Sequence, residues 1–443
     1  MRIRDLFIKN RKFDKKINGI FRDFKQAKEI NANDFDNRVD EVADELYKKY
    51  SKQFSKSEAN NTKIAIVASE IYEIGGHTKC LINFIKSFYQ DYSMILFLTK
   101  LKNTVETTYK ANIPQLKELL NIDGIDVELK NKNCEELVIN LYNKIVSQCS
   151  GIIFSYIHPD DIVASIVFSI LKKHSKVKII FFNHADHLPV VGIKFCDLII
   201  DARPSGQDVN IKIRNYKNSH IIPLQSKKQE ETMYYSEVEI HNCRKNLGIN
   251  DGDFFTLTGC ANYKIFDQNG SSYLKMIKKL LIEESKLKHI IMTKLSPDQQ
   301  DIFDQEFLDR EDLLERVKVI DMVSDFDIFF QSCDLFIDSF PQGSALTHID
   351  MMRNKKPTVI KIDRQDPFKS FEFYLPKNYE YAYEDIEDMK EGILKLLYSD
   401  DLRKKVSKEL YEHYLQNYEF EIVKQQYLKL IENINKLEVY YDA

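Results

Sequence analysis

The sequence lacks the features that mark secreted, membrane-spanning and nucleic-acid-binding proteins. Its seven cysteines include no C-x-x-C pair, and an odd, scattered set is typical of free thiols in a reducing compartment. The first residues carry positive charge but no signal-peptide core, and no run approaches the roughly 18 apolar residues that span a bilayer. The formal charge of -4 argues against nucleic acid as the main partner. We therefore expect a cytoplasmic protein without a transmembrane segment.

Two common nucleotide-binding motifs are also missing. The sequence contains neither the dinucleotide fingerprint G-x-G-x-x-G nor the G-x-x-x-x-G-K-[ST] motif of P-loop NTPases. D-x-D triplets begin at Asp34, Asp251 and Asp325, but none follows a long apolar strand, as a sugar-nucleotide metal site would. We therefore expect neither a metal ion nor a cofactor.

Short β-branched runs alternate with amphipathic helices along most of the chain, which predicts parallel, doubly wound sheets. Because 443 residues exceed one usual core, we expect two Rossmann-like domains facing a cleft. The expected divisions are a helical N-terminal extension (1–60), a first domain (63–224), a linker (225–247), a second domain (248–384) and C-terminal helices (385–443).

The apolar runs locate the expected strands. Those of the first domain are Ile64–Ala68, Met94–Leu98, Ile125–Leu129, Ile152–Ser155, Val177–Phe182, Leu198–Ile200 and Ile221–Leu224. Those of the second are Phe254–Thr258, His289–Thr293, Val317–Ile320, Leu335–Asp338 and Thr358–Ile362. Expected helices include Cys80–Tyr89, Tyr273–Glu284, Asp298–Arg316, 385–398 and 400–436.

The stretch Asp338–Asp350, DSFPQGSALTHID, is the most informative in the chain. It predicts the end of a buried strand, a tight turn broken by Pro341 and Gly343, and a helix with Ser344 at its N-cap. Free backbone N–H groups at such a helix start attract phosphate oxygens. Asp350, one turn beyond Thr347, would then accept hydrogen bonds from a ribose diol. An ordinary strand-to-helix loop is the alternative interpretation.

The first domain opens with a strand followed by Gly75, Gly76 and His77. Glycines after the first strand let the backbone approach a ligand closely, and we expect His77 at the mouth of the following helix. Histidine titrates near neutral pH, so His77 is a candidate general base or acceptor contact. A histidine that merely caps the helix is the alternative.

A second polar group, Asn183-His184-Ala-Asp186-His187, follows the apolar run Val177–Phe182. Such side chains are costly to place at a strand end unless they face a polar cleft. We expect acceptor-side or catalytic contacts here, with structural hydrogen bonding or a metal site as alternatives, although no further metal ligands occur at recognisable spacing. Arg203 follows the next strand and adds a cation to the same rim.

The first strand of the second domain ends near Asn262 and Lys264. A lysine just past a strand end can meet a diphosphate as a point charge. Lys294 ends the following strand in the same way and is a weaker candidate. Lys264 is favoured because its domain also contains the turn before Asp350.

Together, Gly75–Thr78, Asn262–Ile265 and Asp338–Asp350 resemble the motifs of GT-B glycosyltransferases, specifically the group of O-GlcNAc transferase and bacterial protein N-glucosyltransferases. The resemblance covers under a third of the chain. It implies that Lys264 grips the diphosphate of a UDP-sugar, that Gly343, Ser344 and Thr347 donate hydrogen bonds to the phosphates, and that Asp350 binds the ribose. Gly75, Gly76, Asn262 and Gln342 complete the expected nucleotide-sugar site.

The match departs from the Glu-x7-Glu signature of many retaining GT-B enzymes, because Gln342 stands where the first Glu would be. This departure favours inversion. Because a lysine and a helix start can stabilise the departing diphosphate without metal, we expect a metal-independent transfer to a protein side chain or a glycan, with His77, Asp186 or His187 as base and Lys264 assisting the leaving group. We expect the transferred sugar to be a hexose or an N-acetylhexosamine. A UDP-sugar 2-epimerase and a non-catalytic GT-B partner subunit are the alternatives.

Overall fold

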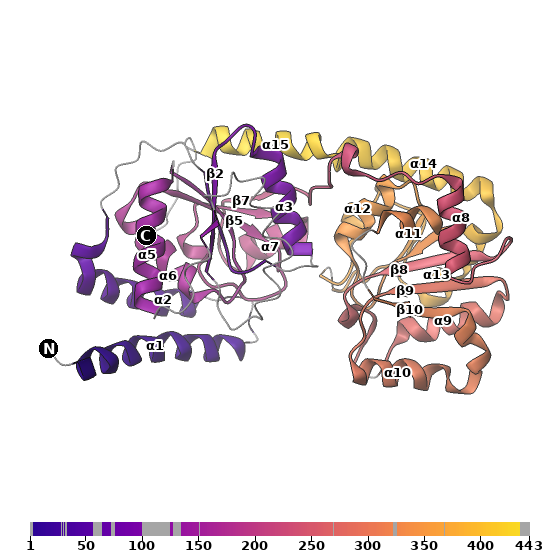
Figure 1. Cartoon of the computed structure of the whole chain (residues 1–443), viewed down its shortest axis with the longest axis horizontal. Coiled ribbons are helices and arrows are strands. Elements are labelled where there is room, and N and C mark those ends of the chain that lie inside the picture. The colour runs from indigo at the N-terminus through magenta and orange to yellow at the C-terminus, as the bar shows by residue number, and fades with distance from the viewer. Residues whose placement is uncertain are drawn as a thin grey trace. The chain divides into compact units, whose positions relative to one another are not determined.

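The chain forms two compact units, residues 1–223 with 424–443 and residues 224–423. The computed structural model (Figure 1) describes residues 3–27, 29, 31, 33–55, 64–71, 76–99, 125–126, 134–149, 151–268, 270–321, 326–366 and 368–434. At 3–12 and 125–126 it describes the backbone alone. All seven cysteines lie in these ranges and are free thiols. No helix among the described residues is long and apolar enough to cross a membrane.

The first unit contains a parallel sheet, which in its described part has seven strands in the order β3-β2-β1-β4-β5-β6-β7. The strands are β1 (Ile64–Ala68), β2 (Met94–Leu98), β3 (Ile125–Asp126), β4 (Ile152–Tyr156), β5 (Lys178–Asn183), β6 (Leu198–Asp201) and β7 (Ser219–Ile221). The order reverses beside β1, between β2 and β4. The carboxyl ends of β1 and β4 therefore flank the switch point of this sheet, where doubly wound folds bind their ligands.

Helices cover both faces of this sheet. They are α1 (Ile3–Lys25), α2 (Asn33–Tyr50), α3 (Gly76–Phe88), α5 (Cys134–Gln148), α6 (Ile162–His174) and α7 (Pro204–Lys212). The N-terminal extension shares the main core, because Phe13 of α1 and Val39 of α2 are buried in one cluster with α5 and α6. On the other face, the ring of Phe84 in α3 lies 4.4 Å from that of Phe154 in β4, centroid to centroid.

The second unit contains a parallel sheet whose described part has six strands in the order β10-β9-β8-β11-β12-β13. These are β8 (Phe254–Gly259), β9 (Leu287–Met292), β10 (Val317–Ile320), β11 (Leu335–Ile337), β12 (Thr358–Lys361) and β13 (Ala382–Tyr383). Here β9 and β11 flank β8, so the switch point lies beside the carboxyl end of β8. The expected fold class, two Rossmann-like domains with terminal helices, is confirmed.

The helices of the second unit are α8 (Glu237–Asn246), α9 (Ser272–Glu283), α10 (Pro297–Phe307), α11 (Asp327–Ser332), α12 (Ala345–Arg353), α13 (Ile386–Tyr398) and α14 (Asp400–Asn417). Helices α9 and α10 lie on one face of the sheet, and α8 and α11 lie on the other (Figure 1). Residues 225–247, the expected linker, belong to this unit and include α8, which begins with a capping box between Ser236 and Glu239. Helix α15 (Phe420–Asn433) runs from the second unit into the first.

Within the described residues, four expected elements differ from the observed ones by three residues or more. Strand β7 is Ser219–Ile221 and not Ile221–Leu224, because Pro223 has no N–H for a ladder. The helix expected at 400–436 breaks at Tyr418, and the Glu419 carboxylate accepts the Glu421 N–H (2.8 Å) at the start of α15. The expected helix Asp298–Arg316 ends as α10 at Phe307, because Arg310 has non-helical backbone angles. Helix α3 begins at Gly76, a turn before the expected Cys80.

Candidate functional site

The turn between β11 and α12 is held closed by a buried carboxylate. Asp338, 1% exposed, follows β11 directly. Its Oδ1 accepts the Ser344 N–H at 3.1 Å, and its Oδ2 lies 3.1 Å from His348 Nε2 on the next helical turn. Ser344 is the N-cap of α12, as its position predicts, but its side chain makes no capping hydrogen bond. Asp338 therefore provides the negative charge at this helix start.

Gly343 fills a position that admits no larger side chain. A Cβ there would lie 2.7 Å from Asp338 Oδ2 and 3.1 Å from the ring of Phe371. Its N–H donates to the Lys369 carbonyl at 2.8 Å. The turn is thus packed from three sides, and its backbone is fixed before any ligand arrives.

These hydrogen bonds engage two of the backbone N–H groups that were expected to contact the phosphates. The backbone N–H groups of Gly343 and Ser344 already donate within the protein, to Lys369 and Asp338. The first-turn N–H groups of Ala345, Leu346 and Thr347 have no intrahelical acceptor, as at the start of any helix. These amides are the donors best placed for an anion, whereas the half-buried hydroxyl of Thr347 lies 3.4 Å from the Gly259 carbonyl and would have to leave it to donate to a ligand.

Lys264 joins this turn from a distant part of the sequence. It lies in the short helical turn Asn262–Ile265 that follows β8. Its Nζ donates to the Gly343 carbonyl at 2.7 Å, and the Gln342 N–H donates to the Lys264 carbonyl at 3.3 Å. The structure thus places the expected lysine beside the expected turn, with its positive charge at the start of α12. The amide of Asn262 donates to the Lys294 carbonyl at 2.8 Å, which ties the same turn to the end of β9.

Asp350 lies in the second turn of α12 and is buried, at 5% exposed. Its Oδ1 is 2.9 Å from Arg353 Nη1. Sequence reasoning missed this partner, although an arginine three residues after an aspartate on one helix is a recognisable pair. The expected ribose-binding carboxylate is therefore already oriented by a guanidinium.

On the first unit, His77 belongs to a cluster of three imidazoles. It lies in the first turn of α3, whereas His158 follows β4 and His184 follows β5. The ring centroids are 4.0 Å apart for His77 and His184, and 5.4 Å apart for His77 and His158. Gly76 is the first residue of α3, and Gly75 lies outside the described residues. Sequence reasoning missed His158, whose signal was its place after the strand next to β1.

The environment favours the neutral form of His77 and His184. Burial, together with His184 and His158, lowers the pKa of His77 well below its usual value. Burial, together with His158, lowers the pKa of His184 to about 3. Among the described residues, neither ring nitrogen of His77 has a hydrogen-bond partner, and nor has Nδ1 of His184. The neutral ring is the form that can accept a proton, although its lowered pKa also makes His77 a weaker base than a free imidazole.

Asp186 has a different character. Its Oδ2 is 2.7 Å from Arg203 Nε, its Oδ1 is 2.9 Å from Arg203 Nη2, and both side chains are buried. Burial favours the neutral acid, but hydrogen bonds from His187 and Arg203 prevail and hold the pKa of Asp186 well below its usual value. His187 Nδ1 lies 3.5 Å from Asp186 Oδ1, and its side chain is 39% exposed. Asp186 and Arg203 thus form a buried ion pair with His187 beside it, and this pairing makes Asp186 a weak base.

Within the described residues, no group of three or more His, Cys, Asp or Glu side chains is arranged to hold a metal ion. The cluster of His77, His158 and His184 is therefore not arranged as a metal site. The positive charge near the turn comes from Lys264 and the start of α12.

Comparisons with known proteins place the fold. No protein-family model and no curated protein sequence matches the chain. Solved structures do match. Anabaena HepE in complex with UDP and glucose has a TM-score of 0.66 at 14% identity over 84% of this chain and 100% of that one. A glycosyltransferase from Rickettsia africae has a TM-score of 0.65 at 10% identity, over 86% of this chain and 100% of that one.

A mutant of the O-GlcNAc transferase from Thermobaculum terrenum has a TM-score of 0.54 at 12% identity, over 94% of this chain and 76% of that one. These structures have the GT-B fold, and so does this chain.

Proposed function

We propose that this chain, which has the GT-B fold, is a glycosyltransferase that moves a sugar from a UDP-sugar to an acceptor hydroxyl or amide. Similar structures include HepE bound to UDP with glucose and to UDP-glucose. The main support for this proposal is the contact between Lys264 and the turn before α12. Lys264 Nζ donates a hydrogen bond to the Gly343 carbonyl at 2.7 Å. A cation and a helix start side by side suit a diphosphate.

On the donor side, the proposal assigns the diphosphate to Lys264, the first turn of α12 and the hydroxyls of Ser344 and Thr347. Asp350 accepts the ribose hydroxyls, and Asn262 and Gln342 line the same turn. Departure of UDP develops negative charge on the diphosphate, which fixed positive groups stabilise more than they stabilise the bound donor. Because Lys264 and the helix start supply that charge, we propose a metal-independent reaction.

On the acceptor side, His77 is the proposed base. The acceptor proton passes to a ring nitrogen of His77 while the acceptor atom attacks the anomeric carbon. The bond between that carbon and the diphosphate oxygen breaks, and its electron pair leaves with UDP. Direct attack inverts the anomeric configuration. His77 is preferred over Asp186 because Arg203 already holds both oxygens of that carboxylate. His187 is the second choice.

The acceptor is proposed to be a protein side chain or a glycan, and the transferred sugar a hexose or an N-acetylhexosamine. The seven free thiols suit a reducing compartment such as the cytoplasm.

The test is nucleotide release from a panel of UDP-, GDP-, CMP- and dTDP-sugars, with Mg²⁺ and with a chelator. We expect release from a UDP-sugar in both conditions, reduced about 10²- to 10³-fold in Lys264→Ala. The matched control is Lys288→Ala, a half-buried lysine of β9 in the same unit. Binding without release would favour a partner subunit, and an isomerised donor would favour an epimerase. No binding of any nucleotide sugar would contradict the donor site.

A further inference from the structure

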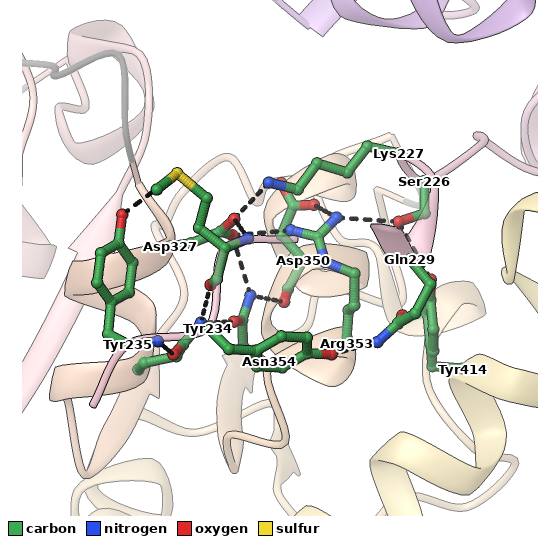
Figure 2. A network of polar contacts seen from close by, with 12 residues as sticks. Ser226, Lys227, Gln229, Tyr234, Tyr235, Asp327, Asp350, Arg353, Asn354 and Tyr414 are labelled. Atoms are coloured by element: carbon green, nitrogen blue, oxygen red, sulfur yellow. Dashed lines mark hydrogen bonds and ion pairs between the residues drawn. The ribbon is translucent and has the colours of Figure 1, made fainter. Parts of the chain in front are cut away.

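Arg353 links two buried carboxylates in the second unit. It is the last residue of α12 and is 1% exposed. Its Nη1 lies 2.9 Å from Asp350 Oδ1, and its Nη2 lies 2.9 Å from Asp327 Oδ1 at the start of α11. Figure 2 shows the guanidinium between the two acids. The side chain of the expected ribose-binding residue is thus anchored to a second helix.

The charges in this network balance. Lys227 forms an ion pair with Oδ2 of Asp327, so two cations face two carboxylates. All four side chains are at least three-quarters buried, which makes the pairing obligatory: removal of one cation would leave a buried carboxylate without compensation. Asp350 therefore depends on Arg353 for its position.

The same guanidinium reaches the chain that connects the two units. Ser226 Oγ accepts from Arg353 Nη1 at 3.1 Å and from the Tyr414 hydroxyl at 3.4 Å. The amide of Gln225 donates to the Phe420 carbonyl at 3.1 Å. The chain passes between the units at 223/224 and again at 423/424. The two connecting segments are therefore tied to one another by Gln225 and Phe420, and Ser226 ties the first segment to Arg353 and so to Asp350. Figure 2 shows the contacts of Arg353 with Ser226 and Asp350.

We propose that Arg353 is a positioning residue for the donor nucleotide, which fixes the Asp350 carboxylate for the ribose hydroxyls and couples their binding to the two segments that connect the units. The inference rests on the proposed function, because it takes Asp350 as the ribose contact. A carboxylate has about four acceptor sites, so Asp350 can accept ribose hydroxyls while Arg353 holds it in place. A ribose bound there adds partners to the network that also holds Ser226.

Arginine suits this role and lysine does not. The planar guanidinium offers several donors in a fixed fork, so it can hold Asp350, Asp327 and Ser226 at once. A lysine keeps the charge but has one ammonium on a flexible stem. Arg353→Lys therefore preserves the charge balance while removing the fixed geometry.

The first test compares UDP with its 2′,3′-dideoxy analogue by calorimetry. We expect Arg353→Lys to weaken UDP binding about ten- to hundredfold, the range for a hydrogen bond to a charged group, and to change binding of the analogue much less. The matched control is Arg244→Lys. Arg244 also bridges several acceptors in the same unit, namely the Ser332 and Asp253 carbonyls and the Asp334 carboxylate, but it does not contact α12.

The outcomes separate the inference from the proposed function. If the wild-type protein binds no UDP, the donor site is wrong and the proposed function fails. If the wild type binds UDP but Arg353→Lys binds it equally well, the positioning role is wrong and the proposed function stands. An equal loss for UDP and the analogue would indicate general disruption of α12, which also contradicts positioning through the ribose.

The second test uses the wild-type chain and does not depend on the folding of a variant. Hydrogen exchange is followed at 224–235 and 414–423, with UDP or the dideoxy analogue at saturation. We expect UDP to slow exchange in both segments and the analogue to slow it less. Equal exchange with both ligands would overturn the coupling, and Ser226→Ala should weaken the UDP effect without abolishing UDP binding.

Discussion

Asp186 is a poor proton acceptor because Arg203 holds both of its oxygens, whereas the ring nitrogens of His77 have no hydrogen-bond partner among the described residues. The two residues look equally suited to catalysis in the sequence, as polar groups that follow strands. Their surroundings decide between them. A hydrogen-bonded ion pair stabilises the charged carboxylate and removes its basicity, and burial beside other imidazoles stabilises the neutral ring.

The lowered pKa of His77 predicts the pH dependence of the reaction. Protonated imidazole cannot accept a proton, so activity falls as pH falls through this pKa. Because burial and His184 hold it well below 6.5, we expect kcat/KM to be nearly constant from pH 6.5 to 8 and to fall only in more acidic solution.

The variant His184→Asn removes a neighbour that lowers this pKa, so the acidic limb of the kcat/KM profile should move to higher pH. The control is His220→Asn, an exposed position in β7 of the same unit. An acidic limb that stays in place in His184→Asn, or moves equally in both variants, would argue against His77 as the base.

At the scale of elements, buried acidic side chains fix how helices join the sheets. Asp36 in α2 is 3% exposed, and the oxygens of its carboxyl group accept the backbone N–H groups of Gly192, at 2.7 Å, and Lys194, at 3.3 Å. In the other unit, Asp338 closes the turn before α12 by accepting a backbone N–H in the same way. In both units a buried acid thus fixes the backbone of a loop beside a helix.

Asp36 predicts a pH dependence of stability. Burial raises its pKa to about 7, so the folded chain keeps a proton that the unfolded chain releases near pH 4. The free energy of unfolding should therefore decrease as pH rises from about 4 to 7, by up to about 1.4 kcal/mol per pH unit from this group. The free energies of unfolding of the wild type and of Asp36→Asn, measured by denaturation across this pH range, test the prediction. The difference between the two should change with pH, and a constant difference would contradict the assignment.

At the scale of the whole molecule, one helix belongs to both units. Helix α15 begins in the second unit and ends in the first, where Lys424 Nζ lies 2.7 Å from Asp91 Oδ2 and the ring of Tyr427 lies 5.2 Å from that of Phe84, centroid to centroid. Phe84 belongs to α3, the helix that also positions His77. The C-terminal segment thus completes the core of the first unit.

We expect Tyr427→Ala to destabilise the first unit by roughly 3–5 kcal/mol, because the side chain is 3% exposed and packs among aromatic rings. Hydrogen exchange or limited proteolysis resolves the two units. The protection of β1 and α3 should fall while that of β8 and α9 is kept. Ile422→Ala, on the same helix at 41% exposed, is the control and should have a much smaller effect. A uniform loss in both units would show that they unfold together.

The sequence by itself determined the architecture, because alternation of apolar runs with amphipathic helices is a local pattern. It also singled out Lys264 and the stretch Asp338–Asp350 as candidates for a nucleotide-sugar site, since glycine, proline and lysine at strand ends have local meaning. The predicted element boundaries were wrong where the backbone of a single residue ends an element, as at Pro223 and Arg310.

Only the tertiary structure decided which polar groups are already paired. Asp338 accepts the hydrogen bond of the Ser344 N–H, Arg203 forms an ion pair with Asp186, and Arg353 forms an ion pair with Asp350. It also brought His158 to His77 and Lys264 to Gly343, across 79 residues in the second case. Such contacts depend on strand order and on crossovers that return distant segments to one sheet edge, and a local pattern does not contain that information.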